Sequence, residues 1–240
     1  MHRAADSIRA AVGGERVRVE FAWEHLADFE GEVRAVTAHG KAVLIHFDDR
    51  VIYTHNQLWG RWYIRKQKSY PRTNRQLRAA LYGPRAWALL YSASEIEVLE
   101  VGEVHPYVAG LGPDLLAGGT TPAMVKKALL KTRRALGTVL LDQGVLAGPG
   151  NYLRSEILWE ARLLPTHTSG ELTPTALNRL SRACLAITRR AYEQKGRTTT
   201  GAERHYAYGR PGKPCLRCKT RIERAEFAGR SIFVCPGCQT

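Results

Sequence analysis

The chain has 240 residues, of which 44% are hydrophobic, and its 36 Lys and Arg side chains outnumber its 22 Asp and Glu side chains, for a net charge of +14. This length and apolar content can bury one large or two medium cores, which excludes a disordered chain. No stretch reaches the apolar length of a membrane span and no apolar segment follows the first basic residues, so we expect a cytoplasmic protein without membrane contact. The positive charge suits a polyanion such as nucleic acid, and a merely solvated basic surface is the alternative.

The first part of the chain is predicted to be rich in β-strands. A helical segment, Arg3 to Val12, ends at Gly13-Gly14, where glycine supplies the left-handed conformation that stops a helix. From about residue 17 to residue 101, short alternating runs rich in Val, Ile, Tyr and Trp are separated by turn signals such as His39-Gly40. We expect a β-rich domain over residues 1–118, with the helix on its flank.

Helical periodicity replaces this pattern after a Gly118-Gly119 break. Thr121-Pro122 is typical of an N-cap followed by proline at the first helical position. The apolar residues that follow predict one buried helix face, formed by Met124, Ala128 and Leu129. Cys184 recurs on the apolar stripe of a later helix, so we interpret it as a packing residue. These signals predict a helical domain over residues 119–200.

Residues 201–240 are expected to combine a linker with a small metal-binding module. Residues 195–213 are rich in Gly, Thr and Arg, which predicts a mobile linker. Two Cys-x-x-Cys pairs, separated by 16 residues, supply four thiolates: Cys215, Cys218, Cys235 and Cys238. This spacing closes a tetrahedral site around one structural zinc ion and leaves no open position for water or substrate. A disulfide framework is the alternative, but four cysteines within 24 positions of a long chain, with the fifth far away, favour zinc.

The candidate phosphate site is a turn-rich segment between two helices, Leu141 to Leu158. Its Gly148-Pro149-Gly150 run predicts a tight turn, after which Asn151 opens an apolar-periodic helix. Backbone N–H groups and an amide at a helix N-terminus favour an anion such as phosphate. The alternative is that Asn151 serves only as the N-cap of its helix.

This segment closely resembles the helix-two-turns-helix signature of the formamidopyrimidine-DNA glycosylase and endonuclease VIII family of base-excision repair enzymes. Residues 229–239 resemble the family's zinc-finger hairpin, and residues 39–44 resemble its lysine turn. Residues 53–60 and 90–96 are similar to the endonuclease VIII branch, which acts mainly on oxidised pyrimidines. The resemblance covers essentially the whole chain. It implies an α+β multidomain fold, with an N-terminal β-sandwich and a helical helix-two-turns-helix domain enclosing a DNA cleft, and a C-terminal zinc finger with four cysteine ligands.

The resemblance also implies roles for two cations. Lys41 is similar to the family lysine that contacts the phosphodiester and takes part in catalysis, and Arg230 is similar to the finger arginine that clamps the backbone at the lesion and assists strand cleavage. A planar guanidinium donates two hydrogen bonds to a phosphate, whereas an ammonium acts as a movable point charge. Asn151 would complete this phosphate grip. Outside their motifs, single cations in so basic a chain would be ordinary solvated charges.

Gln57, Leu58 and Trp59 resemble the loop with which the family fills the gap left by an extruded nucleotide. Extrusion costs a few kcal/mol of unstacking energy. Apolar and aromatic side chains on a loop are suited to insertion between bases. Alternatively, the alternating pattern places Leu58 and Trp59 on a strand that faces the core.

The start of the chain and Gly110 depart from the family pattern. Family members begin, after removal of the initiator Met, with Pro-Glu, whose amine forms a Schiff base at the sugar C1′ and whose carboxyl acts as general acid. This sequence opens with Met1-His2-Arg3, which corresponds to the family's first helix joined at about its seventh residue, so roughly six residues are missing by that comparison. We expect either a start assigned to an internal codon or a loss of lyase chemistry, and we favour the former because the other site motifs are retained. Gly110 stands where the branch carries a DNA-contacting Arg, so one phosphate contact is expected to be absent.

The resemblance implies a base-excision repair DNA glycosylase with AP lyase activity that removes oxidised bases, mainly pyrimidines, from double-stranded damaged DNA. We expect a monomer that is associated with the nucleoid and holds one structural zinc ion. One alternative is a lesion-binding protein without lyase chemistry. Another is a zinc-ribbon nucleic-acid-binding accessory protein, which would need neither the wedge loop nor the double turn.

Overall fold

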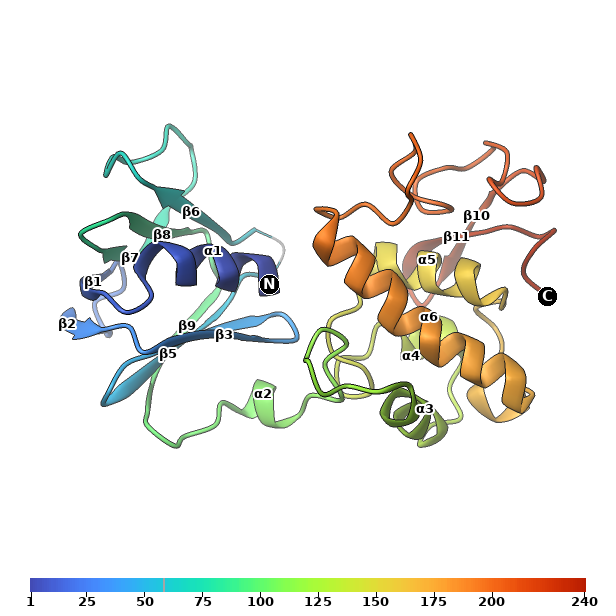
Figure 1. Ribbon diagram of the computed structural model, residues 1–240, viewed down its shortest axis with the longest axis horizontal. Coiled ribbons are helices and arrows are strands. Elements are labelled where there is room, and N and C mark those ends of the chain that lie inside the picture. The colour runs from blue at the N-terminus through green and yellow to red at the C-terminus, as the bar shows by residue number, and fades with distance from the viewer. Residues whose placement is uncertain (58) are drawn as a thin grey trace. The chain divides into compact units, whose positions relative to one another are not determined.

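The structure is a computed structural model that describes residues 1–57 and 59–240. Its internal contacts divide the chain into two units, residues 1–109 and residues 110–240. The first unit is dominated by strands, and the second contains helices and a terminal hairpin (Figure 1). The α+β class expected from the sequence is confirmed. The finer division into three domains stays a prediction.

The first unit begins with a helix and continues with two antiparallel sheets. Its elements are α1 (His2–Val12), β1 (Arg16–Phe21), β2 (Phe29–Glu32), β3 (Ala35–His39), β4 (Ala42–His46), β5 (Arg50–His55), β6 (Arg61–Arg65), β7 (Leu77–Tyr82), β8 (Trp87–Tyr91), β9 (Glu95–Glu100) and α2 (Pro106–Ala109). One sheet has the order β2-β1-β7-β8-β6 and the other has the order β3-β4-β5-β9. Because side chains alternate along a strand, each sheet can turn one apolar face inward.

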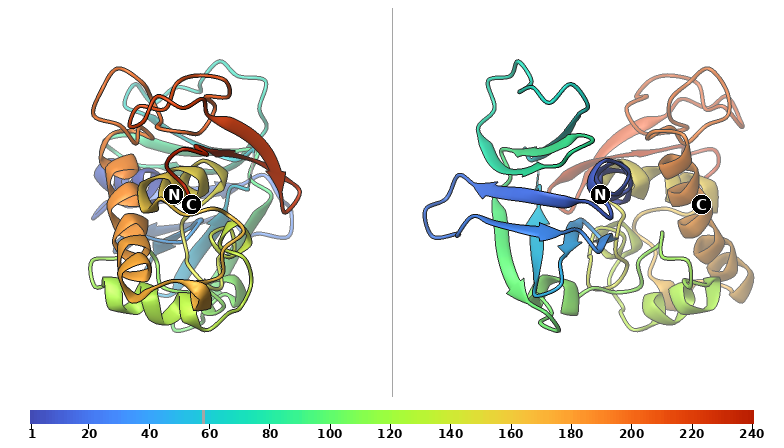
Figure 2. Two further views of the ribbon diagram at one scale, coloured as in Figure 1. Left: turned by 90° about the vertical axis from the view of Figure 1, so that its right-hand side faces the viewer. Right: turned by 60° about the vertical axis from the view of Figure 1, so that its left-hand side comes forward.

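The two sheets form the expected sandwich, because residues of both contribute to one core. Val17 and Val19 on β1 lie in the same buried cluster as Val43 and Ile45 on β4. The apolar face of α1 joins this cluster and contacts strands of both sheets, so the helix covers the core between them (Figures 1 and 2). The left-handed residue after α1 is Gly14, with φ +71°, whereas Gly13 is extended.

The second unit contains the helices of the double-turn segment and the terminal hairpin. Its elements are α3 (Pro122–Leu130), α4 (Leu136–Val139), α5 (Asn151–Ala161), the 3-10 helix η1 (Ser169–Glu171), α6 (Pro174–Glu193), β10 (Glu223–Phe227) and β11 (Arg230–Val234). The predicted N-cap of α3 is confirmed, because the Thr121 hydroxyl accepts a hydrogen bond from Met124 N at 3.3 Å. Met124 itself is 44% exposed, so its predicted place on the buried face was wrong. The buried stripe starts one residue later, at Val125.

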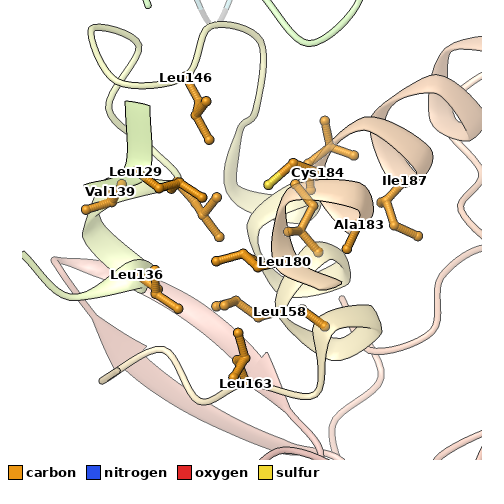
Figure 3. Packing of buried hydrophobic residues seen from close by; sticks show 14 of the residues in the cluster. Leu129, Leu136, Val139, Leu146, Leu158, Leu163, Leu180, Ala183, Cys184 and Ile187 are labelled. Carbon is orange, nitrogen blue, oxygen red and sulfur yellow. The ribbon is translucent and has the colours of Figure 1, made fainter. Parts of the chain in front are cut away.

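Leucine-rich packing holds α3, α4, α5 and α6 together (Figure 3). Cys184 lies fully buried in this core, and burial raises the pKa of its thiol to about 12, as expected for a packing residue. Ile232 and Val234 of β11 belong to the same cluster. The terminal hairpin is therefore continuous with the helical core.

The segment expected to be a mobile linker is instead packed against α5. The fully buried carboxylate of Glu156 accepts hydrogen bonds from the backbone N–H groups of Tyr206, Ala207 and Tyr208, each at 2.8 Å, and from the Thr198 hydroxyl. A buried carboxylate requires such partners, and consecutive backbone N–H groups supply them well. Composition missed this because the ordering group lies about 50 residues earlier in the chain.

Candidate nucleic-acid interface and metal centre

The predicted lysine turn is a tight hairpin between β3 and β4. His39 pairs with Ala42, so Gly40 and Lys41 form a two-residue turn, and Gly40 adopts φ +57°. Such turns need a residue with positive φ, which glycine adopts without strain. The backbone N–H of Lys41 donates to the hydroxyl oxygen of Tyr107 at 3.2 Å. The turn that carries Lys41 is therefore tied to α2.

Aromatic and titratable side chains surround this turn in the first unit. The rings of Tyr53 and His105 stack with 3.7 Å between centroids, and His55 packs edge-on against Tyr107 at 4.9 Å. Burial lowers the pKa of His55, and the nearby charge of Lys41 lowers it further. Burial raises the pKa of Tyr53, and Glu95, which accepts its hydroxyl hydrogen bond at 3.3 Å, raises it further. Both groups are therefore neutral near pH 7.

Gln57 and Trp59 of the predicted wedge are exposed and lie just after β5. Gln57 adopts φ +47° and donates from Nε2 to Glu95 Oε1 at 3.1 Å. The backbone N–H of Gly60 donates to Asn56 O at 2.7 Å, and a Cβ at Gly60 would lie 2.6 Å from the Cα of Asn56, so the turn requires glycine there. Trp59 is 70% exposed, and the alternative that placed it in the core is wrong. Leu58 lies outside the described residues.

The helix expected to bind phosphate, α5, begins at Asn151, but Asn151 is not its N-cap. The cap position is Gly150, which has no side chain to satisfy the first N–H groups of the helix. The Asn151 amide instead donates to the carbonyl oxygen of Ser231, on β11, at 3.0 Å. The N-cap alternative was therefore wrong, and the side chain links the helix to the terminal hairpin.

A buried arginine completes this link between the helix and the hairpin. Arg154 is fully buried and donates to the Asn151 side-chain oxygen at 2.8 Å and to the carbonyl oxygens of Gly137, Phe227, Arg230 and Ser231 at 3.1 to 3.2 Å. Burial lowers the pKa of Arg154 to about 10, and the charge of Arg230 contributes to this. Arg154 remains charged at neutral pH and fixes the backbone of the hairpin.

Arg230 lies at the tip of this hairpin with an exposed side chain. Phe227 pairs with Arg230 across a two-residue turn, Ala228-Gly229, in which both residues have positive φ. This is the turn geometry that matches the twist of a two-stranded ribbon. Arg154 thus binds both Asn151 and the backbone of Arg230, although these two residues lie 79 positions apart in the sequence.

The four predicted zinc ligands converge on one point. The sulfur atoms of Cys215, Cys218, Cys235 and Cys238 all lie within 4.8 Å of one another. Tetrahedral zinc with Zn–S bonds of about 2.3 Å needs sulfur separations of about 3.8 Å, so this donor set fits one zinc ion. The indole N–H of Trp159 donates to Cys215 Sγ at 3.3 Å, which supports that ligand from α5.

Sequence reasoning assigned no role to Tyr107, Arg154 or Glu156. The last two carried a detectable signal, because both are charged residues between the apolar residues Leu153 and Ile157 of the helix. A charged group on a buried helix face needs a specific partner, so its presence indicates a structural or functional contact. Nothing in the sequence near Tyr107 indicated that its hydroxyl would reach a turn 66 residues earlier.

Among the described residues, no helix combines the length and the apolar character that spanning a bilayer requires. Two family models match the second unit. Residues 111–202 match the formamidopyrimidine-DNA glycosylase H2TH domain, and residues 212–240 match a zinc finger found in FPG and IleRS. The second match agrees with the four-cysteine cluster, and the finger holds a structural zinc ion.

Full-length relatives and solved structures extend these matches to the first unit. The chain is 41% identical to Endonuclease 8 of Pectobacterium atrosepticum over an alignment 259 positions long, covering 100% of this chain and 98% of the relative. It is 38% identical to Endonuclease 8 of Escherichia coli, covering 100% and 97%. A crystal structure of the Lactococcus lactis FPG (MutM) with a FAPY-dG containing DNA has a similar fold, with TM-score 0.82, 19% identity and coverage of 99% and 98%.

Proposed function

Because the chain belongs to the formamidopyrimidine-DNA glycosylase and endonuclease VIII family, we propose that it is a base-excision repair DNA glycosylase with AP lyase activity. Its substrate is double-stranded DNA that carries an oxidised base, mainly a pyrimidine. The protein acts as a monomer close to chromosomal DNA. At the level of residues, one observation carries this proposal. The buried Arg154 donates hydrogen bonds both to the Asn151 side chain and to the backbone of the hairpin that bears Arg230.

This attachment supports a preorganised grip on the DNA backbone. The first turn of α5 offers backbone N–H groups without a side-chain cap, and a helix N-terminus attracts anions. The Arg230 guanidinium is exposed at the hairpin tip, where it can donate two hydrogen bonds to a phosphate. Because Arg154 holds the Asn151 side chain and the backbone of the hairpin, the grip needs little rearrangement when DNA binds.

Lys41 is proposed to contact the phosphodiester next to the lesion. The lysine lies at a hairpin tip whose backbone is fixed by Tyr107, so the direction in which the side chain leaves the turn is also fixed. His55 carries no charge at neutral pH, because burial lowers its pKa. A neutral His55 therefore does not compete with Lys41 for the phosphate.

Gln57, Leu58 and Trp59 are proposed to fill the gap in the duplex after the damaged nucleotide has left the stack. The 70% exposure of Trp59 supports this role, since an indole on the surface loses the apolar contacts that a buried one makes. Inserted between bases, it would recover stacking energy of about 1 to 3 kcal/mol. The hydrogen bond from Gln57 to Glu95 anchors the base of the loop.

The test is a cleavage assay on a labelled duplex that contains one oxidised pyrimidine, such as 5-hydroxyuracil, beside an undamaged duplex. We expect base release, strand cleavage at the lesion and a borohydride-trapped covalent protein–DNA adduct from a chain extended with the family's Pro-Glu-Gly start, which supplies the amine and the carboxyl. Binding to the lesion without cleavage or adduct would favour the lesion-binding alternative. A protein that neither prefers the lesion nor cleaves would match a zinc-ribbon accessory protein.

A further inference from the structure

An arginine-rich pocket lies in the second unit at the carboxyl end of α5. Its volume is about 570 Å³, and it is lined by the end of α5, one face of α6 and the first cysteine knuckle. The four arginines of its wall are Arg162, Arg179, Arg182 and Arg217. From Asn151 to Ala161, α5 spans its full 11 residues, which corresponds to a rise of about 15 Å. The pocket is therefore distinct from the phosphate grip at the start of the helix.

Two of these arginines are held in place by the end of α5. Arg179 Nε donates to the carbonyl oxygen of Ala161 at 2.6 Å, and Arg217 Nη1 donates to the carbonyl oxygen of Trp159 at 3.2 Å. The guanidinium of Arg217 also lies 3.9 Å from the centroid of the Trp159 ring. The last carbonyl groups of a helix have no partner inside it and carry partial negative charge, so they suit cations. These contacts fix the two guanidinium groups and leave further N–H donors on Arg179.

The other two arginines make the pocket strongly positive. Arg162 and Arg182 are exposed, and neither side chain has a hydrogen-bond or ion-pair partner within the described part of the chain. Glu160 is the one carboxylate in the described lining, and it already pairs with Arg217 at 3.3 Å. Four guanidinium groups and one carboxylate leave a local charge of +3 in a single concavity. Like charges held together repel one another, so a bound anion would stabilise this arrangement.

The shape and the floor of the pocket favour a peptide over DNA. Residues Thr175, Asn178, Arg182 and Ala186 repeat at helical spacing along α6, so the lining follows the helix for about 16 Å, the length of an extended peptide of about five residues. Ala183 and Ala186 contribute methyl groups, which an aliphatic side chain can contact and a phosphodiester cannot use. A DNA duplex is too broad to enter a concavity of this volume, so only its phosphates could reach the arginines at the rim, without using the floor.

We propose that this pocket binds an acidic segment of a partner protein. Carboxylates of the segment would pair with Arg162 and Arg182, and an apolar side chain would lie against Ala183 and Ala186. Arg–carboxylate pairs can form two parallel hydrogen bonds, which gives such a site preference for carboxylates over neutral polar groups.

The experiment measures fluorescence anisotropy of a labelled ten-residue peptide of alternating Glu and Leu. The full-length wild type is compared with the Arg162→Glu/Arg182→Glu variant and with a charge-matched control, Arg72→Glu/Arg133→Glu, whose residues are exposed and lie outside the pocket. We expect the pocket variant to lose at least about tenfold in affinity and the control to lose less than about threefold. A peptide with Gln in place of Glu should bind weakly to all three proteins.

Lesion cleavage by the pocket variant should remain at the wild-type level, which would also show that the variant folds. If the charge reversal unfolds the protein, Arg162→Ala/Arg182→Ala replaces it in the peptide-binding assay. Equal loss of peptide affinity in the pocket variant and in the control would overturn the proposal, because net charge alone would then explain binding. Absence of peptide binding to the wild type would also overturn it. A greater loss of affinity for undamaged duplex than for the peptide would assign the pocket to DNA instead.

Discussion

The hydroxyl oxygen of Tyr107 accepts a hydrogen bond from the backbone N–H of Lys41, with 3.2 Å between the two atoms. The bond joins the turn between β3 and β4 to α2, the last element of the first unit. The ring of Tyr107 also contacts His55, whose centroid lies 4.9 Å away. Tyr107 is thus a positioning residue for the proposed catalytic lysine, through a bond to the lysine's backbone N–H.

Replacing Tyr107 with Phe removes this hydrogen bond and keeps the ring. A neutral hydrogen bond contributes about 0.5 to 1.5 kcal/mol, so we expect lesion cleavage to slow by roughly two- to tenfold. Affinity for damaged duplex should change little. Tyr63→Phe is the matched control, because the Tyr63 hydroxyl has no hydrogen-bond partner among residues 1–57 and 59–240. Equal cleavage rates for the two variants would show that Tyr107 does not position Lys41.

Arg230→Ala is expected to weaken DNA binding and to change its salt dependence. Removing one phosphate contact should reduce the slope of log affinity against log salt by about one unit. The hairpin should remain in place, because Arg154 bonds to the Arg230 carbonyl oxygen, which alanine retains. Asn151→Ala is the comparison, since losing a neutral amide should lower affinity and leave the slope intact. If the Arg230→Ala variant keeps the wild-type salt slope, the guanidinium of Arg230 does not contact phosphate in the wild type.

Trp59→Ala should leave the free energy of unfolding within about 0.5 kcal/mol of the wild type, because the side chain is 70% exposed. Affinity for damaged duplex should fall by at least about fivefold, which is the lower end of one lost stacking contact. Single-stranded DNA with the same lesion should be affected less, since it has no gap to fill. Val104→Ala, which trims another exposed apolar side chain, serves as control. A large loss of thermal stability in Trp59→Ala would place the indole in the core.

Zinc removal is expected to loosen more than the terminal hairpin. Ile232 and Val234 of β11 pack in the helical core, so a chelator or Cys218→Ser should lower the unfolding temperature of the second unit and reduce DNA affinity. Metal analysis should give one zinc per chain. Cys184→Ala is the control, because its thiol lies in the core away from the ligand cluster and the variant should retain zinc. A zinc-free wild type with full DNA affinity would contradict this account.

Stability is expected to fall on acidification through pH 6.5, in part because of His55. Burial lowers the pKa of this histidine in the folded state, so the unfolded chain binds the proton first as the pH decreases. The stabilisation is therefore present above the unfolded pKa of about 6.5 and is lost as the pH falls towards the folded pKa, at up to about 1.4 kcal/mol per pH unit. Urea unfolding between pH 7 and pH 5 should show a smaller loss in His55→Gln. Parallel pH profiles for the two proteins would contradict the assignment.

The amino-acid sequence alone determined the class of fold, the four zinc ligands and the positions of the motif residues. These features depend on local signals, such as the Cys-x-x-Cys spacing, the Thr121-Pro122 helix start and the alternation of the strands, which neighbouring residues specify without long-range contacts. The packing role of Cys184 could be predicted for the same reason, because helical periodicity places it on a buried stripe.

Tertiary structure decided what each motif residue contacts. Asn151 could have been a helix cap by its position in the sequence, and only the approach of β11 made its amide a partner of Ser231. Residues 198–208 have the composition of a loose linker, yet the buried carboxylate of Glu156 orders their backbone. A buried charge must find its hydrogen bonds wherever the fold supplies them. Most partners of Arg154 and Glu156 lie about 50 to 80 residues away along the chain, beyond the range of any local pattern.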